Sequence, residues 1–194
     1  PKDKLLEVLN QNQEFTELIP VFKDYGIKGL YQYIMELSTE ESDRILRPLV
    51  HRILPLYKHN SLSKASPDYW AAKAVLSDNK DTVLDKGIFS IYFFNIVKLS
   101  KGEAIFQDAG IPHAYLEGQN MELMANSDNV LRAGLTPKQI DIEELLKHFV
   151  FKETEPFILK GELQSVHKER IFKTPAPDFQ LSKINLKNFE EYLM

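Results

Sequence analysis

The sequence predicts an α+β protein in which helices come first and antiparallel strands follow. In the first part of the chain, apolar residues recur at three- and four-residue spacings, which is the period of a helix. After Gly87 the apolar residues are mostly aromatic or β-branched and lie between turn residues, which is typical of short strands. The 194 residues are enough for one ordinary domain or two small ones.

At least four helices are expected between residues 1 and 82. Ser38 is followed three residues later by Glu41, and this capping box predicts a helix start because each side chain satisfies a free amide there. Ser66, Pro67 and Asp68 predict a second helix start, and that helix runs to about Leu76.

Strands are expected over residues 87–99, 104–106 and 121–125, with turns between them. Short strands in this order are typical of an antiparallel barrel or sandwich. A helix interrupts them from about Ile140 to Phe149, because Asp141 at its start and Lys147 at its end suit the helix dipole. The rest of the chain, after this helix, is expected to form a few edge strands.

Composition excludes several classes of protein. The net charge is -4 and the basic residues form no stripe, so a nucleic-acid partner is not expected. No apolar stretch approaches the roughly 20 residues that cross a bilayer, so no membrane association is expected. The absence of cysteine excludes disulfides and thiolate metal sites and fits a reducing compartment, for which we expect the cytoplasm. Because the chain begins with Pro1 and not Met, we expect an excised piece of a longer protein.

His113 stands out among the five histidines. It follows a glycine turn, a short strand and a loop restricted by Pro112, so one imidazole extends from a rigid wall. The spacing resembles the second half of the cupin signature. On spacing alone, a metal ligand and a hydrogen-bonded barrel histidine are equally supported. The other four histidines are better explained as surface or packing residues; they are His51, His59, His148 and His167.

Several sequence blocks at fixed separations follow. They are Gly102-Glu103-Ala104-Ile105-Phe106, Pro112-His113-Ala114-Tyr115, Met121-Glu122-Leu123-Met124-Ala125 and the run from Ser127 to Lys138. Together they resemble the signature region of the type I phosphomannose isomerases. A weaker likeness extends to both sides and covers most of the chain.

The resemblance implies a zinc-dependent aldose–ketose isomerase that interconverts mannose 6-phosphate and fructose 6-phosphate, and hence a phosphorylated hexose substrate. It also implies a cupin (jelly-roll) barrel interrupted by a helical insertion and followed by a second barrel. In this chain, residues 1–82 would be the insertion domain, 83–150 the returning half of the catalytic barrel and 151–194 the start of the second barrel.

The family's zinc ion has four protein ligands, and His113 matches the last of them. The other three, a Gln-x-His pair and a glutamate, are expected outside this chain, which contains no Gln-x-His. A single imidazole does not hold zinc tightly. We therefore expect neither zinc nor turnover from this chain alone.

The resemblance also implies roles for five other residues. Arg132 matches an active-site arginine that stabilises negative charge on oxygen, although it could instead be a buried partner of Asp128. Lys138 matches a pocket lysine that contacts phosphate or moves a proton; without the family it is a solvent lysine. Glu122 could act as a base or hold a hydroxyl unless it faces outward, Tyr115 could line the pocket or pack, and Asp128 orients Arg132.

Two other classes of protein remain open. A noncatalytic cupin-like sugar-binding or regulatory module would need no zinc ligands. A helical interaction domain would use residues 1–82 as its binding part, but core packing explains the same amphipathic pattern.

Overall fold

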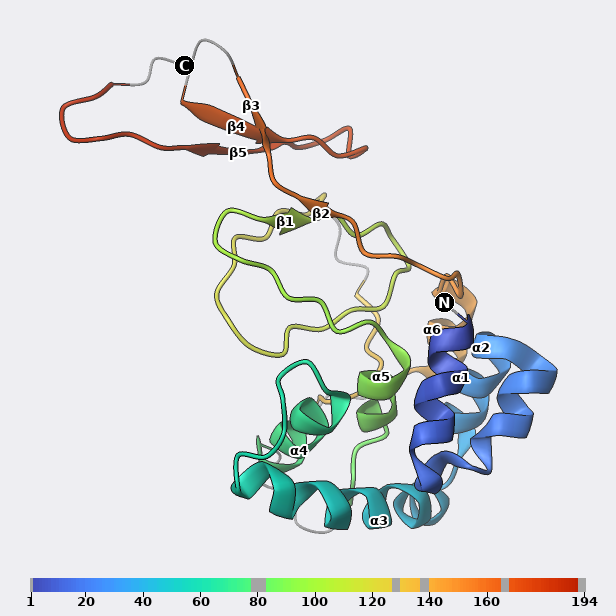
Figure 1. The fold of residues 1–194 in the computed structure, drawn as a ribbon. Coiled ribbons are helices and arrows are strands. Elements are labelled where there is room, and N and C mark those ends of the chain that lie inside the picture. The colour runs from blue at the N-terminus through green and yellow to red at the C-terminus, as the bar shows by residue number, and fades with distance from the viewer. Residues whose placement is uncertain (1, 78–82, 127–129, 137–139, 165–167, 192–194) are drawn as a thin grey trace. The chain divides into compact units, whose positions relative to one another are not determined.

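The structure is a computed structural model and describes residues 2–77, 83–126, 130–136, 140–164 and 168–191. The chain divides into two compact units, each built from separate segments (Figure 1). Unit 1 comprises Pro1–Ile96, Gly110–Leu116 and Val130–Thr154; unit 2 comprises Val97–Ala109, Glu117–Asn129 and Glu155–Met194. The two units together contain helices and antiparallel strands, which confirms the predicted α+β class.

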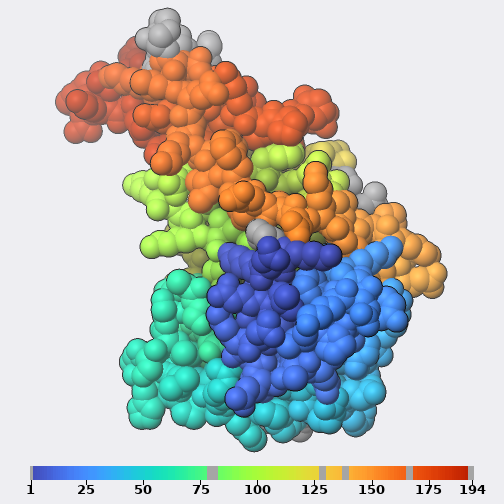
Figure 2. Space-filling view, turned by 45° about the vertical axis from the view of Figure 1, so that its right-hand side comes forward, coloured from blue at the N-terminus to red at the C-terminus, as the bar shows by residue number. Residues whose placement is uncertain are grey.

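Unit 1 is helical. Its elements are α1 (Lys2–Gln11), the 3-10 helix η1 (Gln13–Phe15), α2 (Leu18–Glu36), α3 (Thr39–Lys58), α4 (Pro67–Ser77), α5 (Gly87–Phe93) and α6 (Ile142–His148). Helices α1 and α2 lie side by side, as the space-filling view also shows (Figure 2), and α3 packs against α4. The expectation of at least four helices in the first 82 residues is confirmed.

Polar side chains cap two helices, α3 through the predicted capping box and α6 through Asp141, which was expected near its start because of the helix dipole. The Ser38 hydroxyl accepts from the amide of Glu41 at 3.1 Å, and the Glu41 carboxylate accepts from the amide of Ser38 at 2.8 Å. At the start of α6, the Asp141 carboxylate accepts from the amide of Glu144 at 3.0 Å. These bonds satisfy amides that have no partner within the helix, which explains why both helices begin there.

The prediction of a strand over residues 87–99 is wrong: residues 87–93 form helix α5, and residues 94–99 form no regular element. All residues of α5 except Ser90 are buried, so the helix has no polar face and its sequence shows no helical period. Phe15 explains part of this burial, because its ring packs against Phe89, Tyr92 and Phe93 at centroid distances of 5.8, 5.0 and 6.4 Å. Packing against neighbouring helices has therefore overridden the β propensity of these residues.

Segments from the second half of the chain complete the core of unit 1. Leu145 of α6 is fully buried. Tyr31 of α2 meets three phenylalanine rings, those of Phe94, Phe149 and Phe151, at centroid distances of 5.9, 5.4 and 5.8 Å. This aromatic cluster joins α2 to the residues that follow α5 and α6.

Unit 2 contains two small antiparallel sheets. Strand β1 (Ala104–Ile105) pairs with β2 (Ile158–Leu159), and Ala104 lies opposite Leu159. Strand β4 (Glu169–Phe172) lies between β3 (Glu162–Leu163) and β5 (Leu181–Ile184). The short strand near Ala104 and the later edge strands are thus confirmed.

The prediction of a strand over residues 121–125 is wrong. These residues form no regular element, and the side chains of Met121, Leu123 and Met124 are 82%, 45% and 65% exposed. A strand needs a hydrogen-bonded neighbour and a covered apolar face, and this segment has neither among the described residues.

None of the described helices combines the length and apolar character that a bilayer crossing requires.

Candidate functional site

His113 lies on an exposed loop of unit 1 and has one ring nitrogen already engaged. Its Nδ1 lies 2.9 Å from the carbonyl oxygen of Ile111. Because a carbonyl can only accept, Nδ1 carries the proton in this contact and Nε2 keeps its lone pair in the neutral ring. Metal-binding histidines commonly make this kind of backbone contact, since it sets the tautomer and the ring orientation.

The loop of His113 is attached to the segment after α6 through Gly110. The amide of Val150 donates to the carbonyl of Gly110 at 3.0 Å. Gly110 has a φ of 76°, and a Cβ at this position would lie 2.7 Å from the carbonyl oxygen of His148. Only glycine allows both this backbone conformation and this close approach.

Tyr115 is the one predicted substrate-binding residue that the structure places beside His113. The two rings meet edge to face at a centroid distance of 6.4 Å. Tyr115 is 65% exposed, so it is not a core packing residue in this structure. Whether its ring lines a sugar pocket next to the imidazole stays a prediction.

Arg132 also belongs to unit 1 and is half-buried on the segment Val130–Thr136. No described residue forms an ion pair with it. Its expected partner Asp128 and the predicted phosphate-binding residue Lys138 both lie outside the described residues. Whether Arg132 pairs with Asp128 therefore stays a prediction.

Glu122 is exposed on a segment of unit 2. The expected strand over residues 121–125 is absent. Strand alternation therefore does not decide whether the carboxylate points inward or outward. Its proposed contact with sugar stays a prediction.

The described residues do not form a complete metal cage. Nowhere in the described ranges do three His, Asp or Glu side chains come together in a way that could hold an ion. His113 fits the part of one zinc ligand by its chemistry and its free Nε2, but tetrahedral zinc needs more donors than this.

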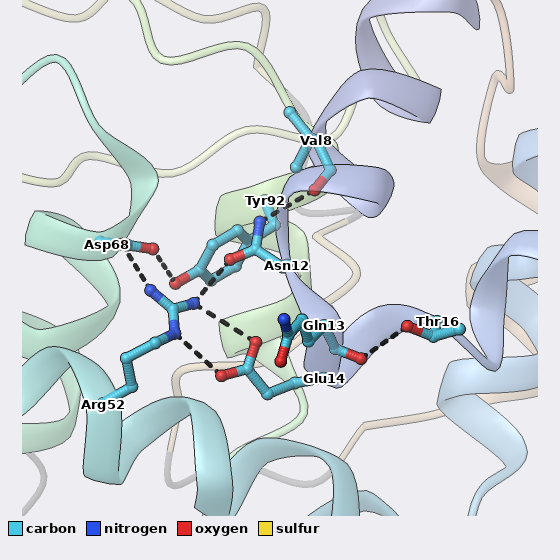
Figure 3. Close-up of polar contacts among 8 residues, drawn as sticks. All are labelled: Val8, Asn12, Gln13, Glu14, Thr16, Arg52, Asp68 and Tyr92. Atoms are coloured by element: carbon cyan, nitrogen blue, oxygen red, sulfur yellow. Dashed lines mark hydrogen bonds and ion pairs between the residues drawn. The ribbon is translucent and has the colours of Figure 1, made fainter.

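A polar cluster of unit 1 lies among the helices and centres on Arg52 (Figure 3). The Arg52 guanidinium donates to Glu14 at 2.8 Å, to Asp68 at 3.1 Å and to the side-chain oxygen of Asn12 at 2.7 Å. The hydroxyl of Tyr92 on α5 donates to Asp68 at 2.7 Å. The cluster joins the α1–η1 connection, α3, α4 and α5, and each charged group in it is paired, which is the pattern of a structural network.

The pKa values in this cluster agree with a structural role. Burial by itself would raise the pKa of Glu14, but the hydrogen bond and charge of Arg52 outweigh it and hold that pKa below its ordinary value. Burial, together with the Asp68 carboxylate, raises the pKa of Tyr92 well above its ordinary value. Neither shift brings a group toward neutral pH, where a general acid or base would need it.

Sequence reasoning did not identify Arg52 as important, because an arginine on a helix beside His51 gives no pattern that separates it from a surface residue. It also gave no role to the glycines at positions 87, 110 and 134. The signal in each case is three-dimensional: a set of partners from distant helices, or a backbone approach that excludes a side chain.

Comparison with known proteins identifies relatives that match most of this chain. The mannose-6-phosphate isomerase 2 of Arabidopsis thaliana is 35% identical over 199 residues, and the mannose-6-phosphate isomerase of Escherichia coli is 32% identical over 191 residues. Each match covers 94% of this chain but only 44% and 48% of the relative. The chain is homologous to a segment of the mannose-6-phosphate isomerases.

Solved structures give the same result. The apo mannose 6-phosphate isomerase of Salmonella typhimurium superposes with a TM-score of 0.73 at 31% identity, covering 94% of this chain and 45% of that one. A second structure of that enzyme, bound to its substrate f6p and to zinc, superposes with a TM-score of 0.72. The chain thus spans about half the length of the mannose-6-phosphate isomerases it matches. No family model matches it.

Proposed function

We propose that this chain is part of a zinc-dependent aldose–ketose isomerase that interconverts mannose 6-phosphate and fructose 6-phosphate in the cytoplasm. The observation that supports this most directly is the similarity of 94% of the chain to isomerases, one of which holds zinc and f6p. In this proposal, segments 83–150 and 151–194 contribute to two cupin-type barrels and residues 1–82 form the helical insertion.

His113 is the zinc ligand that this chain supplies. The Ile111 carbonyl holds the proton on Nδ1, which directs the lone pair of Nε2 outward for coordination. The three remaining ligands come from outside this chain, so the chain alone neither binds zinc nor turns over substrate. A zinc ion held there polarises a sugar oxygen or orients its hydroxyls.

Arg132 supplies a fixed positive charge for the same reaction. Moving a carbonyl between C1 and C2 passes through an enediol-like species that bears negative charge on oxygen. The guanidinium stays protonated at any working pH and stabilises that charge without reorganisation. Lys138 contacts the substrate phosphate, Tyr115 borders the sugar, Glu122 acts as a base or holds a sugar hydroxyl, and Asp128 orients Arg132.

The test compares this chain with a version extended at its N-terminus to the length of its relatives. Metal analysis and an isomerase assay on both should find zinc and turnover only in the extended protein. Sugar binding by the extended protein without zinc and without turnover would instead support a noncatalytic sugar-binding module.

The role of His113 is tested by His113→Ala in the extended protein, with His51→Ala as the matched control. His51 is also an exposed histidine but lies on α3. Zinc content and activity should fall together for His113→Ala and stay unchanged for His51→Ala. Retention of a full equivalent of zinc by His113→Ala would remove this imidazole from the ligand set.

A further inference from the structure

The turn that precedes helix α5 is held to two other helices. The carboxylate of Asp85 accepts from the amide of Gly87, the first residue of α5, at 2.6 Å. The Lys86 ammonium donates to the carbonyl of Met35 at 2.9 Å, at the end of α2. The amide of Leu84 donates to the carboxylate of Asp43 on α3 at 3.0 Å. The start of α5 is therefore a well-anchored part of unit 1.

The loop that carries Arg132 rests on this anchored turn through two glycines. A Cβ at Gly134 would lie 2.6 Å from the Cα and 2.9 Å from the nitrogen of Gly87. A Cβ at Gly87 would in turn lie 2.7 Å from the nitrogen of Leu135. The backbones touch directly, and neither position has room for a side chain. We call this the glycine contact.

The loop also has an unusual backbone conformation at the glycine contact. Gly134 has a φ of 143° and Leu135 a φ of 52°, values that side-chain-bearing residues rarely adopt. On either side, Ala133 packs against the core, and Leu135 lines a cavity of about 20 Å³ with Leu84 and Ile88. The surrounding contacts thus hold a strained backbone in place two residues after Arg132.

We propose that Gly134 and Gly87 are positioning residues for the isomerase reaction, because their backbone contact places the Arg132 guanidinium relative to the helical core. This inference rests on the proposed function, in which Arg132 stabilises the oxyanion. Neither glycine touches substrate; both act through the arginine. A methyl group at Gly134 must push the loop away from α5 and carry Arg132 with it.

The first test is Gly134→Ala in the extended, zinc-loaded protein. A misplacement of about 1 Å in a charge that acts only in the transition state costs roughly 10²-fold in rate. We expect kcat to fall by about that factor, while KM and zinc content stay near those of the wild type. A kcat within about twofold of the wild type in a folded Gly134→Ala protein would overturn the proposal.

The control is Gly26→Ala, because Gly26 also has a positive φ, of 66°, but has nothing within 4 Å of the position of a Cβ. This substitution brings backbone strain without a steric clash, and kcat should not change. A kcat loss equal to that of Gly134→Ala would show that general strain, and not the glycine contact, is responsible.

A double-mutant cycle then separates positioning through Arg132 from other effects. If Gly134 acts through the arginine, Arg132→Ala and Arg132→Ala/Gly134→Ala should have the same kcat. Multiplied losses would contradict the proposal.

Hydrogen exchange of the amides of residues 133–136 tests the contact independently of activity. Exchange should be faster in Gly134→Ala than in the wild type. This expectation does not depend on which reaction the protein catalyses. Unchanged exchange would overturn the contact, whereas faster exchange in a protein without isomerase activity would contradict only the proposed function. If Gly134→Ala does not fold, Leu135→Ala can be used instead: it removes the side chain that lies beside Gly87, introduces no clash, and should give faster exchange and a smaller kcat loss.

Discussion

The helical core of unit 1 and the two loops that carry His113 and Arg132 belong to one compact unit but are held by different means. In the core, side chains such as Phe15, Leu46 and Ile53 are fully buried and pack against one another. In the loops, the side chains of the candidate residues are exposed or half-buried, and glycine backbones make the close contacts with the core.

This difference separates stability from function. Apolar burial provides most of the free energy of folding, so substitutions in the core should lower the free energy of unfolding. The candidate side chains bury little surface, so their loss should change activity and leave stability almost unaffected. The following predictions test that separation.

The largest expected effect is that of Phe15→Ala. Its ring is fully buried among three aromatic rings of α5, and truncation leaves a cavity. We expect the free energy of unfolding to fall by about 3–5 kcal/mol in urea titrations. Tyr25→Ala is the matched control, because this ring is 72% exposed, and its change should stay within about 0.5 kcal/mol.

Arg52→Ala should have the next largest effect. It leaves the carboxylates of Glu14 and Asp68, which are only 11% and 18% exposed, without their cation. Because Arg52 itself is 39% exposed and solvent screens part of the interaction, we expect a loss of about 1–3 kcal/mol in the same titrations. Arg44→Ala breaks a solvent-exposed pair with Glu17 and should lower the free energy of unfolding much less than Arg52→Ala does. Equal losses for the two variants would remove the distinction between the cluster and the surface.

Glu14→Gln should show a smaller effect that depends on pH. The folded state lowers the pKa of Glu14 below its ordinary value of 4.5, so its carboxylate contributes stability above that value. This contribution is lost as the pH falls through the lowered pKa. The wild type should therefore be more stable than Glu14→Gln at pH 7, and the difference should shrink in titrations carried out progressively below pH 4.5. A difference that stays constant with pH would contradict the ion pair as its cause.

His113→Ala should have the smallest effect on stability. The ring is exposed, and its hydrogen bond to Ile111 is local, so the free energy of unfolding without metal should change by less than about 0.5 kcal/mol. The same substitution should abolish zinc binding in the extended protein. A large loss of stability in the metal-free state would show that His113, like Phe15, contributes to the stability of the fold.

Helices with a polar cap and one apolar face could be predicted from the sequence. Ser38 and Glu41 identified the start of α3, and Asp141 that of α6, because the capping bonds are made between residues close in sequence. Helix α5 could not be predicted in this way. It is buried on nearly all sides, and the side chain of its N-cap residue Lys86 makes no capping hydrogen bond.

The candidate residues were identified from sequence blocks, not from periodicity. His113 and Arg132 lie on irregular loops, and the backbones of Gly110 and Gly134 approach other parts of unit 1 closely there. Such contacts join residues far apart in sequence and have no repeating pattern. The sequence could therefore indicate which residues matter, but not how unit 1 holds them, and their roles stay predictions.

The aromatic cluster around Tyr31 has a consequence for synthesis on the ribosome. Phe149 and Phe151, which cover this ring, are translated long after it. At about 5–20 residues per second, the face of α2 that bears Tyr31 waits on the order of ten seconds for its cover. During that interval the nascent chain presents an uncovered aromatic surface, which is the kind of surface that chaperones recognise.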